Sequence, residues 1–151
     1  MLYKKDLINL LDISGCDYFI KEHEALHTVE DSKALRGTIS GAHSKNLFLK
    51  DAKGQFYLLS IEENTSIDLK KTMKHIGSKK LSFARAEYLY SILGIEPGSV
   101  SPFSLINDKN KKVIFFLDKK FLDSEKVNFH PLVNTATINI STLDMISFVE
   151  K

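Results

Sequence analysis

The segment GAHSKNLFLKDAKG, Gly41–Gly54, predicts the centre of the fold. Its middle, Asn46–Leu49, has the composition of a buried strand, and DAKG after it is typical of a hairpin turn leading to a second strand at Gln55–Ile61. Lys45 stands immediately before the first strand, at the end of a GAHS loop. A lysine at a strand end is either solvated or directed into a pocket, and the residues alone leave both interpretations open.

Weaker patterns on both sides of the hairpin predict further elements. Apolar spacing, capping residues and terminal glycines predict helices at 7–15, 28–37, 68–77, 82–94 and 141–151, with Ser82 and Ser141 as N-caps. Apolar runs predict strands at 16–23, 111–118 and 135–140. The continuous apolar centre of 111–118 indicates burial on both faces, whereas 135–140 alternates like a half-buried strand. Strands in the middle and helices at both ends favour an α+β fold.

Size and composition limit the class of protein. The 151 residues fit one domain, 1–151, and the 21 basic and 19 acidic residues leave a net charge of only +2. A single cysteine, Cys16, permits no intrachain disulfide and no thiolate zinc cluster, and the histidines lack metal-site spacing. Neither a signal peptide nor a membrane-spanning stretch is expected. We therefore expect a cytoplasmic protein without membrane association, metal or other cofactor.

Three polar loops carry the remaining signals for chemistry. The first leads to Lys45, the second is GIEPGSVSPFSLIND at 94–108, and the third is VNFHPLVNTAT at 127–137. Pro97-Gly98 predicts a turn after which backbone N–H groups could face an acceptor, and Pro131 favours an extended His130. Each feature also has an ordinary explanation: a solvated lysine, a plain turn and a packed histidine. On the residues alone, the chain is an α+β domain with three polar loops around a candidate pocket.

Three motifs in order, SKNLFLKD, Gly98-Ser-Val-Ser-Pro102 and FHPLVNTAT, resemble the YbaK/ProX family of editing domains associated with prolyl-tRNA synthetase. The resemblance is greatest to the ProXp-ala branch, because the YbaK branch generally lacks the histidine stretch. It implies a mixed, mostly antiparallel sheet or barrel-like core flanked by helices. It also implies hydrolysis of mischarged alanine from the 3′ end of tRNA(Pro), with cysteinyl, seryl or threonyl esters, or a non-catalytic binding module, as alternatives.

The resemblance also implies site residues. Lys45 would anchor the terminal nucleotide or the ester oxygen, His130 would place a water, and Gly98 and Ser99 would receive the substrate through their backbone. Six further residues would bind or enclose the substrate: Asn46, Val100, Ser101, Pro102, Ile20 and Phe129. Because an aminoacyl ester is already reactive, we expect catalysis by positioning rather than by His130 as a free general base.

The expected partners are the acceptor end of tRNA(Pro) and, as a further candidate, prolyl-tRNA synthetase; no DNA is expected. Sequence-independent affinity for RNA comes mainly from phosphate contacts, so basic side chains would form the RNA surface. The candidate residues for such a face are Lys79, Lys80, Arg85, Lys109, Lys111, Lys112, Lys119 and Lys120. Ordinary solvated lysines explain the same residues equally well.

Overall fold

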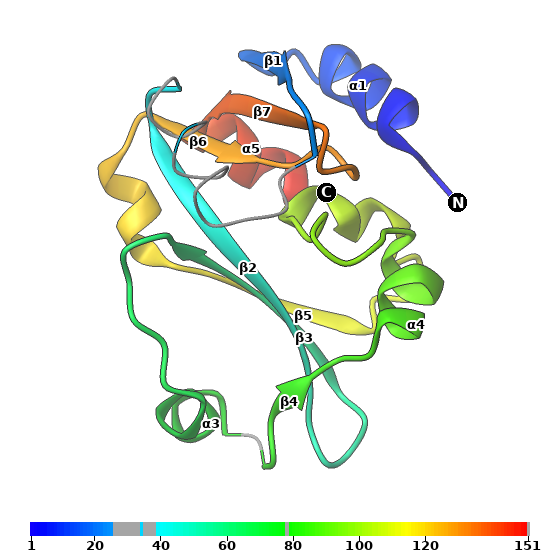
Figure 1. Cartoon of the computed structure of the whole chain (residues 1–151), viewed down its shortest axis with the longest axis vertical. Helices are drawn as coiled ribbons and strands as arrows, with labels where there is room; N and C mark the ends of the chain where they lie inside the picture. The colour runs from blue at the N-terminus through cyan, green and yellow to red at the C-terminus, as the bar shows by residue number, and fades with distance from the viewer. Residues whose placement is uncertain (26–33, 35–38, 78, 151) are drawn as a thin grey trace.

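The computed structural model describes residues 1–25, 34, 39–77 and 79–150, and Figure 1 shows the arrangement of their elements. The helical elements are α1 (Lys4–Ile13), α3 (Leu69–Ile76), α4 (Ala86–Tyr88), the π-helix η1 (Leu89–Leu93), the 3₁₀-helices η2 (Pro102–Asn107) and η3 (Lys119–Asp123), and α5 (Thr142–Val149). The strands are β1 (Tyr18–Glu22), β2 (Ala42–Lys50), β3 (Phe56–Glu62), β4 (Ser82–Phe83), β5 (Val113–Leu117), β6 (Lys126–Phe129) and β7 (Ala136–Ser141).

The described strands form one mixed sheet in the order β1-β7-β6-β2-β3-β5, with β4 added beside β2. Two of the pairings, β2 with β6 and β3 with β5, are parallel, and the others are antiparallel. The predicted α+β class and the mostly antiparallel sheet are confirmed. The sheet stays open because β1 and β5 lie at opposite edges, so the core is not a closed barrel.

The predicted hairpin is formed by β2 and β3, which pair from Ser44 opposite Glu62 to Lys50 opposite Phe56. Asp51 holds the turn, since its Oδ1 accepts hydrogen bonds from the Lys53 and Gln55 N–H groups, both at 2.9 Å. This is the side-chain-to-backbone bonding that makes aspartate favourable in turns.

The two faces of the hairpin pack against different groups of apolar residues. Phe48 belongs to the main core, where its ring stacks on Phe56 at 5.3 Å between centroids. Leu47 and Leu49 face the other way, into a smaller group that we call the second cluster. Its buried members are Leu49, Tyr57, Leu59, Ile61 and Leu81, with Leu47, Ile67, Leu69, Met73 and Ile76 packed around them.

Two predictions about local structure are wrong for tertiary reasons. Ser82 does not cap a helix: it lies in β4 opposite Lys50, and the helical turn begins only after Arg85. The strand β5 is not buried on both faces, because it lies at a sheet edge and leaves Ile114 and Phe116 exposed.

Strand β7 departs from its prediction in the opposite direction, since five of its six residues are buried. Ile138 and Ile140 lie in the main core. Asn139 lies on the other face, where it is also buried and its Nδ2 donates hydrogen bonds to Ser40 O and Asn128 Oδ1. In this strand, polar residues alternate with apolar ones because they form hydrogen bonds inside the protein, and not because they face solvent. The helix predicted at 28–37 lies, apart from residue 34, outside the described residues.

The Asp51 carboxyl makes stability depend on pH. Burial opposes its charge, but hydrogen bonds from the Gln55 and Lys53 N–H groups and the Tyr57 hydroxyl outweigh that effect and lower the pKa of Asp51. A folded pKa below the unfolded value, about 3.9, gives stability that is present above that pH and is lost as pH falls through the folded value.

We therefore expect Asp51→Asn to be less stable than wild type at pH 7, with the difference shrinking below about pH 4. Urea unfolding from pH 7 to pH 3 measures this. Asp123→Asn, at an exposed position, serves as the control and should follow wild type. A difference between Asp51→Asn and wild type that is constant with pH would contradict the prediction.

Candidate active site

The second and third polar loops meet in the fold through Ser101. This side chain is fully buried, and its Oγ donates a 2.7 Å hydrogen bond to the carbonyl oxygen of His130. His130 follows directly after β6, so the bond ties the segment 94–108 to the end of a sheet strand. The two loops therefore occupy a defined position relative to each other.

The Gly98 turn forms as the sequence predicts. The Ser99 N–H donates to Glu96 O at 3.1 Å, which closes a β-turn with Pro97 and Gly98 at its centre. Gly98 has a φ of +91°, a conformation that favours glycine, and a Cβ at this position would lie 3.4 Å from Asn134 Nδ2 in the third loop. The Ser99 N–H is thus engaged within the turn, and Val100 is half-buried against the main core.

The orientation of His130 is set by its Nδ1, which lies 2.9 Å from the carbonyl oxygen of Ala136. A carbonyl only accepts, so Nδ1 carries the proton in the neutral ring and Nε2 is the basic nitrogen. The ring has a neighbour that sequence reasoning missed, because the His23 ring lies 6.2 Å away between centroids, tilted by 59°.

His23 is fixed by the same logic. Its Nδ1 lies 2.8 Å from Glu24 O, so Nδ1 carries the proton, and its Nε2 then accepts from the Thr137 hydroxyl at 2.9 Å. His23 ends the predicted strand 16–23, but only the pairing of β1 with β7 brings it beside the third loop. Nothing in its sequence spacing could have indicated this.

Lys45 does not follow a loop as predicted. It is the fourth residue of β2, half-buried, with Ile61 as its cross-strand partner. It lies on the face of Leu47 and Leu49, and its side chain forms no hydrogen bond or ion pair with the residues that the structure describes.

The edge of β2 near Lys45 changes partners. Strand β2 pairs with β6 at Ala42 and His43 and with β4 from Leu49 onward, so in the described part of the chain no strand covers this edge between them. His43 is level with Asn128 in the parallel register, and the same offset brings Lys45 level with His130. Continued beyond the paired residues, this register brings the three polar loops of the sequence to the same stretch of β2.

Asn46 occupies the opposite face of β2. Its Nδ2 donates to Ser44 Oγ at 3.1 Å, and its Oδ1 accepts from the buried Ser60 hydroxyl at 2.5 Å. The Ser44 hydroxyl in turn donates to Asn128 O at 3.0 Å. This chain of hydrogen bonds holds β2 against β3 and β6 on both sides of Lys45.

Three predicted substrate contacts lie against the core. Phe129 is 2% exposed, with its ring 6.1 Å from Phe103 and 5.7 Å from Phe121, so it packs in the core. Ile20 is half-buried on β1 and packs on the same core. Pro102 is buried at the start of η2.

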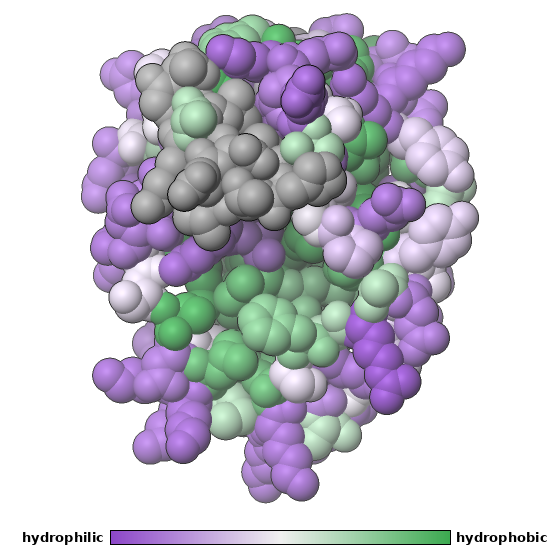
Figure 2. Space-filling model, in the orientation of Figure 1, coloured by the Kyte–Doolittle hydropathy of each residue, from purple (hydrophilic) through white to green (hydrophobic). Residues whose placement is uncertain are grey.

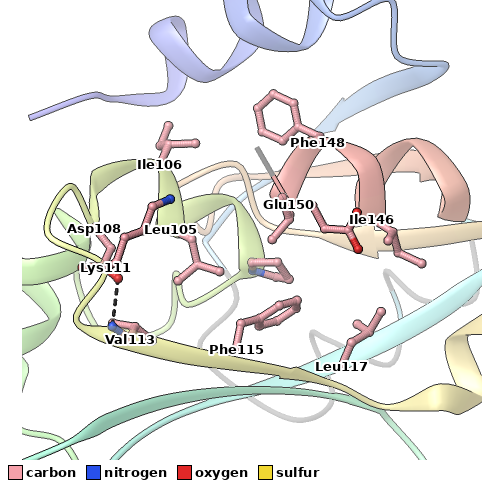
Figure 3. Close-up of a pocket in the computed structure, with 12 residues that line it drawn as sticks. Leu105, Ile106, Asp108, Lys111, Val113, Phe115, Leu117, Ile146, Phe148 and Glu150 are labelled. Carbon is pink, nitrogen blue, oxygen red and sulfur yellow. Dashed lines mark hydrogen bonds between the residues drawn. The ribbon is translucent and has the colours of Figure 1, made fainter.

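Pro102 also lines a cavity of about 400 Å³ between η2, β5 and α5, shown in Figure 3. Phe115, Leu105 and Ile146 give it an apolar lining, and Asp108 at its rim accepts a 2.9 Å hydrogen bond from the Val113 N–H. Lys45 and His130 do not line this cavity, and we do not assign it to the site.

Comparison with known proteins identifies the class. The sequence profile of the aminoacyl-tRNA editing domain matches residues 23–148. The chain is 36% identical over 148 residues to the prolyl-tRNA editing protein ProX of Acetoanaerobium sticklandii, covering 97% of this chain and 90% of ProX. It is 37% identical over 136 residues to the prolyl-tRNA synthetase associated domain-containing protein 1 of Mus musculus, covering 87% and 80%.

Solved structures agree on the fold. The chain superposes with a TM-score of 0.75 on the hypothetical protein APE2540, at 19% identity over 94% of this chain and 92% of that one. A candidate trans-editing enzyme for prolyl tRNA synthetase gives 0.74 at 19% identity, over 99% and 94%. The fold and the match are those of an aminoacyl-tRNA editing domain. This chain belongs to that family, as the resemblance of its three motifs to the YbaK/ProX proteins implied.

Two absences hold for the described residues. No group of three or more histidine, cysteine, aspartate or glutamate side chains is arranged there to hold a metal ion. No helix among them has the length and apolar character needed to cross a bilayer.

The Ser101 hydrogen bond gives a direct test of how the two loops are joined. Ser101→Ala leaves the His130 carbonyl without this donor and should lower the free energy of unfolding by about 1–3 kcal/mol. The neighbouring buried serine is the control: Ser99→Ala removes a hydroxyl with no hydrogen bond to the described residues and should cost less than about 1 kcal/mol. Urea denaturation of both variants measures this, and equal losses would contradict the assigned bond.

Proposed function

We propose that this protein hydrolyses the ester of mischarged tRNA(Pro), with alanyl-tRNA(Pro) as its substrate. The observation that carries the proposal is Lys45: a half-buried lysine on β2, two residues beyond the pairing of His43 with Asn128, in a chain of the aminoacyl-tRNA editing family. The names of the relatives from Acetoanaerobium and mouse, which refer to prolyl-tRNA editing and prolyl-tRNA synthetase, support the choice of tRNA.

Mischarged alanine is the amino acid whose removal most requires a separate editing pocket. A synthetase pocket shaped for proline cannot strongly reject a smaller amino acid, because a missing methylene changes binding by only about 1–3 kcal/mol. A separate pocket that admits alanine and excludes the prolyl ring supplies the missing selectivity. In this chain Ile20 remains the candidate wall, since Phe129 lies in the core.

The reaction is the addition of water to the ester carbonyl. The water oxygen bonds to the carbonyl carbon, the bond from that carbon to the ribose oxygen breaks, and the water proton ends on the ribose oxygen. The products are free alanine and uncharged tRNA. Lys45 supplies a point charge for the terminal phosphate or for the oxygen on which negative charge develops.

His130 places the water, and its ring is held in position by the contact of Nδ1 with the Ala136 carbonyl. The Gly98 turn forms the opposite wall, joined to His130 through Ser101. Asn46 acts indirectly in this mechanism: its bonds to Ser44 and Ser60 fix the β2 backbone that carries Lys45.

His23 is a positioning residue in this mechanism. Its ring is fixed by Glu24 O and Thr137 Oγ1 and lies beside the His130 ring, so it limits how that ring can turn. The acceptor end of tRNA(Pro) is the proposed partner, with prolyl-tRNA synthetase as a further one. The cytoplasm, where tRNA is charged, is the proposed location.

The decisive experiment measures release of amino acid from alanyl-, cysteinyl-, seryl-, threonyl- and prolyl-tRNA(Pro). We expect rapid loss of alanine only, and a fall of about 100-fold or more in Lys45→Ala, the scale for removal of one charge-stabilising group. Lys53→Ala, an exposed lysine in the hairpin turn, is the matched control and should keep full activity.

The other outcomes decide between the alternatives. Preferential release of cysteine, serine or threonine would replace alanine as the substrate. If no ester is cleaved above background, the enzyme assignment fails, and the non-catalytic tRNA- or synthetase-binding module takes its place.

The role of His23 is tested through its buried partner, Thr137. Thr137→Val removes the hydroxyl at nearly constant shape, releases the His23 ring and should lower kcat about 10- to 100-fold with KM for tRNA unchanged. Thr137→Ser keeps the hydroxyl and should restore kcat. Equal kcat values in the two variants would refute the positioning role.

A further inference from the structure

Positive charge is concentrated in one short segment. Residues 68–80, which contain α3, hold five lysines and one aspartate, whereas the net charge of the whole chain is only +2. The rest of the chain is therefore net negative. The five lysines are all exposed: Lys70, Lys71, Lys74, Lys79 and Lys80.

Nearby acidic groups do not neutralise this segment. Asp68 is the N-cap of α3 and accepts from the Lys70 N–H at 2.9 Å. Asp118 is buried in part, but hydrogen bonds from the Lys120 and Glu62 N–H groups and the Thr65 hydroxyl engage its carboxylate and lower its pKa. The ion pairs between described residues leave the five lysines out.

Helix α3 presents Lys70, Lys71 and Lys74 on a fixed support. Leu69, Met73 and Ile76 pack its inner side on the second cluster, and Gly77 ends it in the left-handed conformation at a φ of +78°. In Figure 1 the helix lies apart from the main body of the fold, at the lower left.

A groove of about 690 Å³ runs between α3 and the strands β3 and β5. Leu59, Ile61 and Phe116 contribute apolar surface to it, and Lys71 and Lys119 lie at its rim. Ile61 is also the cross-strand partner of Lys45, so the groove begins next to the candidate active site. Figure 2 shows apolar surface gathered in the region of β2, β3 and α3, bordered by hydrophilic side chains.

We propose that α3 and this groove form the docking surface for the acceptor end of the substrate RNA. The exposed lysines contact phosphates of the acceptor stem, and the groove receives bases of the unpaired 3′ end on its way to Lys45. This inference rests on the proposed function, because it assigns the RNA contacts of the same site. Phosphates need exposed, unneutralised cations, and unstacked bases need apolar and aromatic surface, and here the two are adjacent.

The basic face expected from the sequence is divided by the fold. Lys79, Lys80, Lys119 and Lys120 remain candidates for this surface. Arg85 is paired with Glu87 at 3.6 Å, and Lys111 lines the separate cavity of Figure 3 beside Asp108. Lys109 and Lys112 line another pocket, beside Met1 and Ser91, and do not line the groove, so we leave them out of the docking surface.

The phosphate contacts are tested with a triple variant, Lys70→Gln/Lys71→Gln/Lys74→Gln, against a triple of equal charge loss elsewhere, Lys53→Gln/Lys109→Gln/Lys112→Gln. Fluorescence anisotropy with an uncharged acceptor-stem minihelix, at several salt concentrations, measures binding without any need for hydrolysis. We expect the α3 triple to weaken binding about tenfold or more and to reduce the salt slope by roughly one per lost contact, while the control triple binds like wild type.

The groove is tested with a matched pair on one strand. Phe116, 40% exposed, lines the groove, and Ile114, 44% exposed, lies on the same face of β5 outside it. Phe116→Ala should weaken binding of the minihelix about tenfold, the scale of one lost stacking contact, only when its unpaired 3′ nucleotides are present. Ile114→Ala should leave the affinity for both minihelices unchanged, with and without the unpaired 3′ nucleotides. The α3 triple should weaken both minihelices, with and without the unpaired end.

The outcomes separate this inference from the proposed function. If the wild type cleaves no ester but the minihelix effects appear as described, the docking surface stands and the activity does not. If alanyl-tRNA is cleaved but both triples bind equally, the α3 surface is refuted. It is equally refuted if only full-length tRNA, and not the minihelix, responds to the α3 triple, or if the triple loses binding to vesicles of anionic phospholipid instead of RNA.

Discussion

Strand β2 hydrogen-bonds to three other strands, and the rest of the fold depends on which stretch of β2 each of them pairs with. It pairs with β3 along most of its length, with β6 only at its first residues and with β4 only at its last. An antiparallel partner on one side and two short partners on the other hold the strand at both ends. Among the described residues, no strand pairs with this edge of the stretch between them, and Lys45 lies in that stretch. The opening in the sheet is thus a consequence of strand order.

The two faces of β2 carry side chains with different roles. One face carries Phe48 into the main core and Asn46 into a chain of hydrogen bonds with Ser44 and Ser60. The other face carries Lys45 and Leu47 toward the second cluster, on which α3 rests. Because side chains alternate along a strand, rigidity and chemistry are provided by adjacent residues of one segment. A lysine held on so well-supported a backbone suits a reaction in which positioning is the main demand.

The residues around His130 are likewise held in fixed positions by hydrogen bonds. Backbone carbonyls determine the protonated nitrogen of both His23 and His130, and one buried hydroxyl, that of Ser101, joins the His130 segment to the Gly98 turn. These contacts come from β1, β7 and two loops far apart in the chain. In the mechanism that we propose, the reactive ester requires little covalent chemistry from the protein, so an arrangement that orients a water and a carbonyl is sufficient.

Local physical chemistry determined much of this protein from its sequence alone. The aspartate and glycine of DAKG specify the hairpin, Asp68 and Gly77 delimit α3, and the Pro97-Gly98 turn forms as predicted, because each depends on residues within one turn of chain. The three motifs likewise indicated the family. Only the tertiary structure decided burial and proximity. Ser82 became a strand because an edge of β2 was available to it, Asn139 was buried because Ser40 and Asn128 satisfy its amide, and Phe129 entered the core between two other rings. His23 reached His130 only through the pairing of β1 with β7. Such outcomes depend on partners many residues distant, which no local pattern encodes.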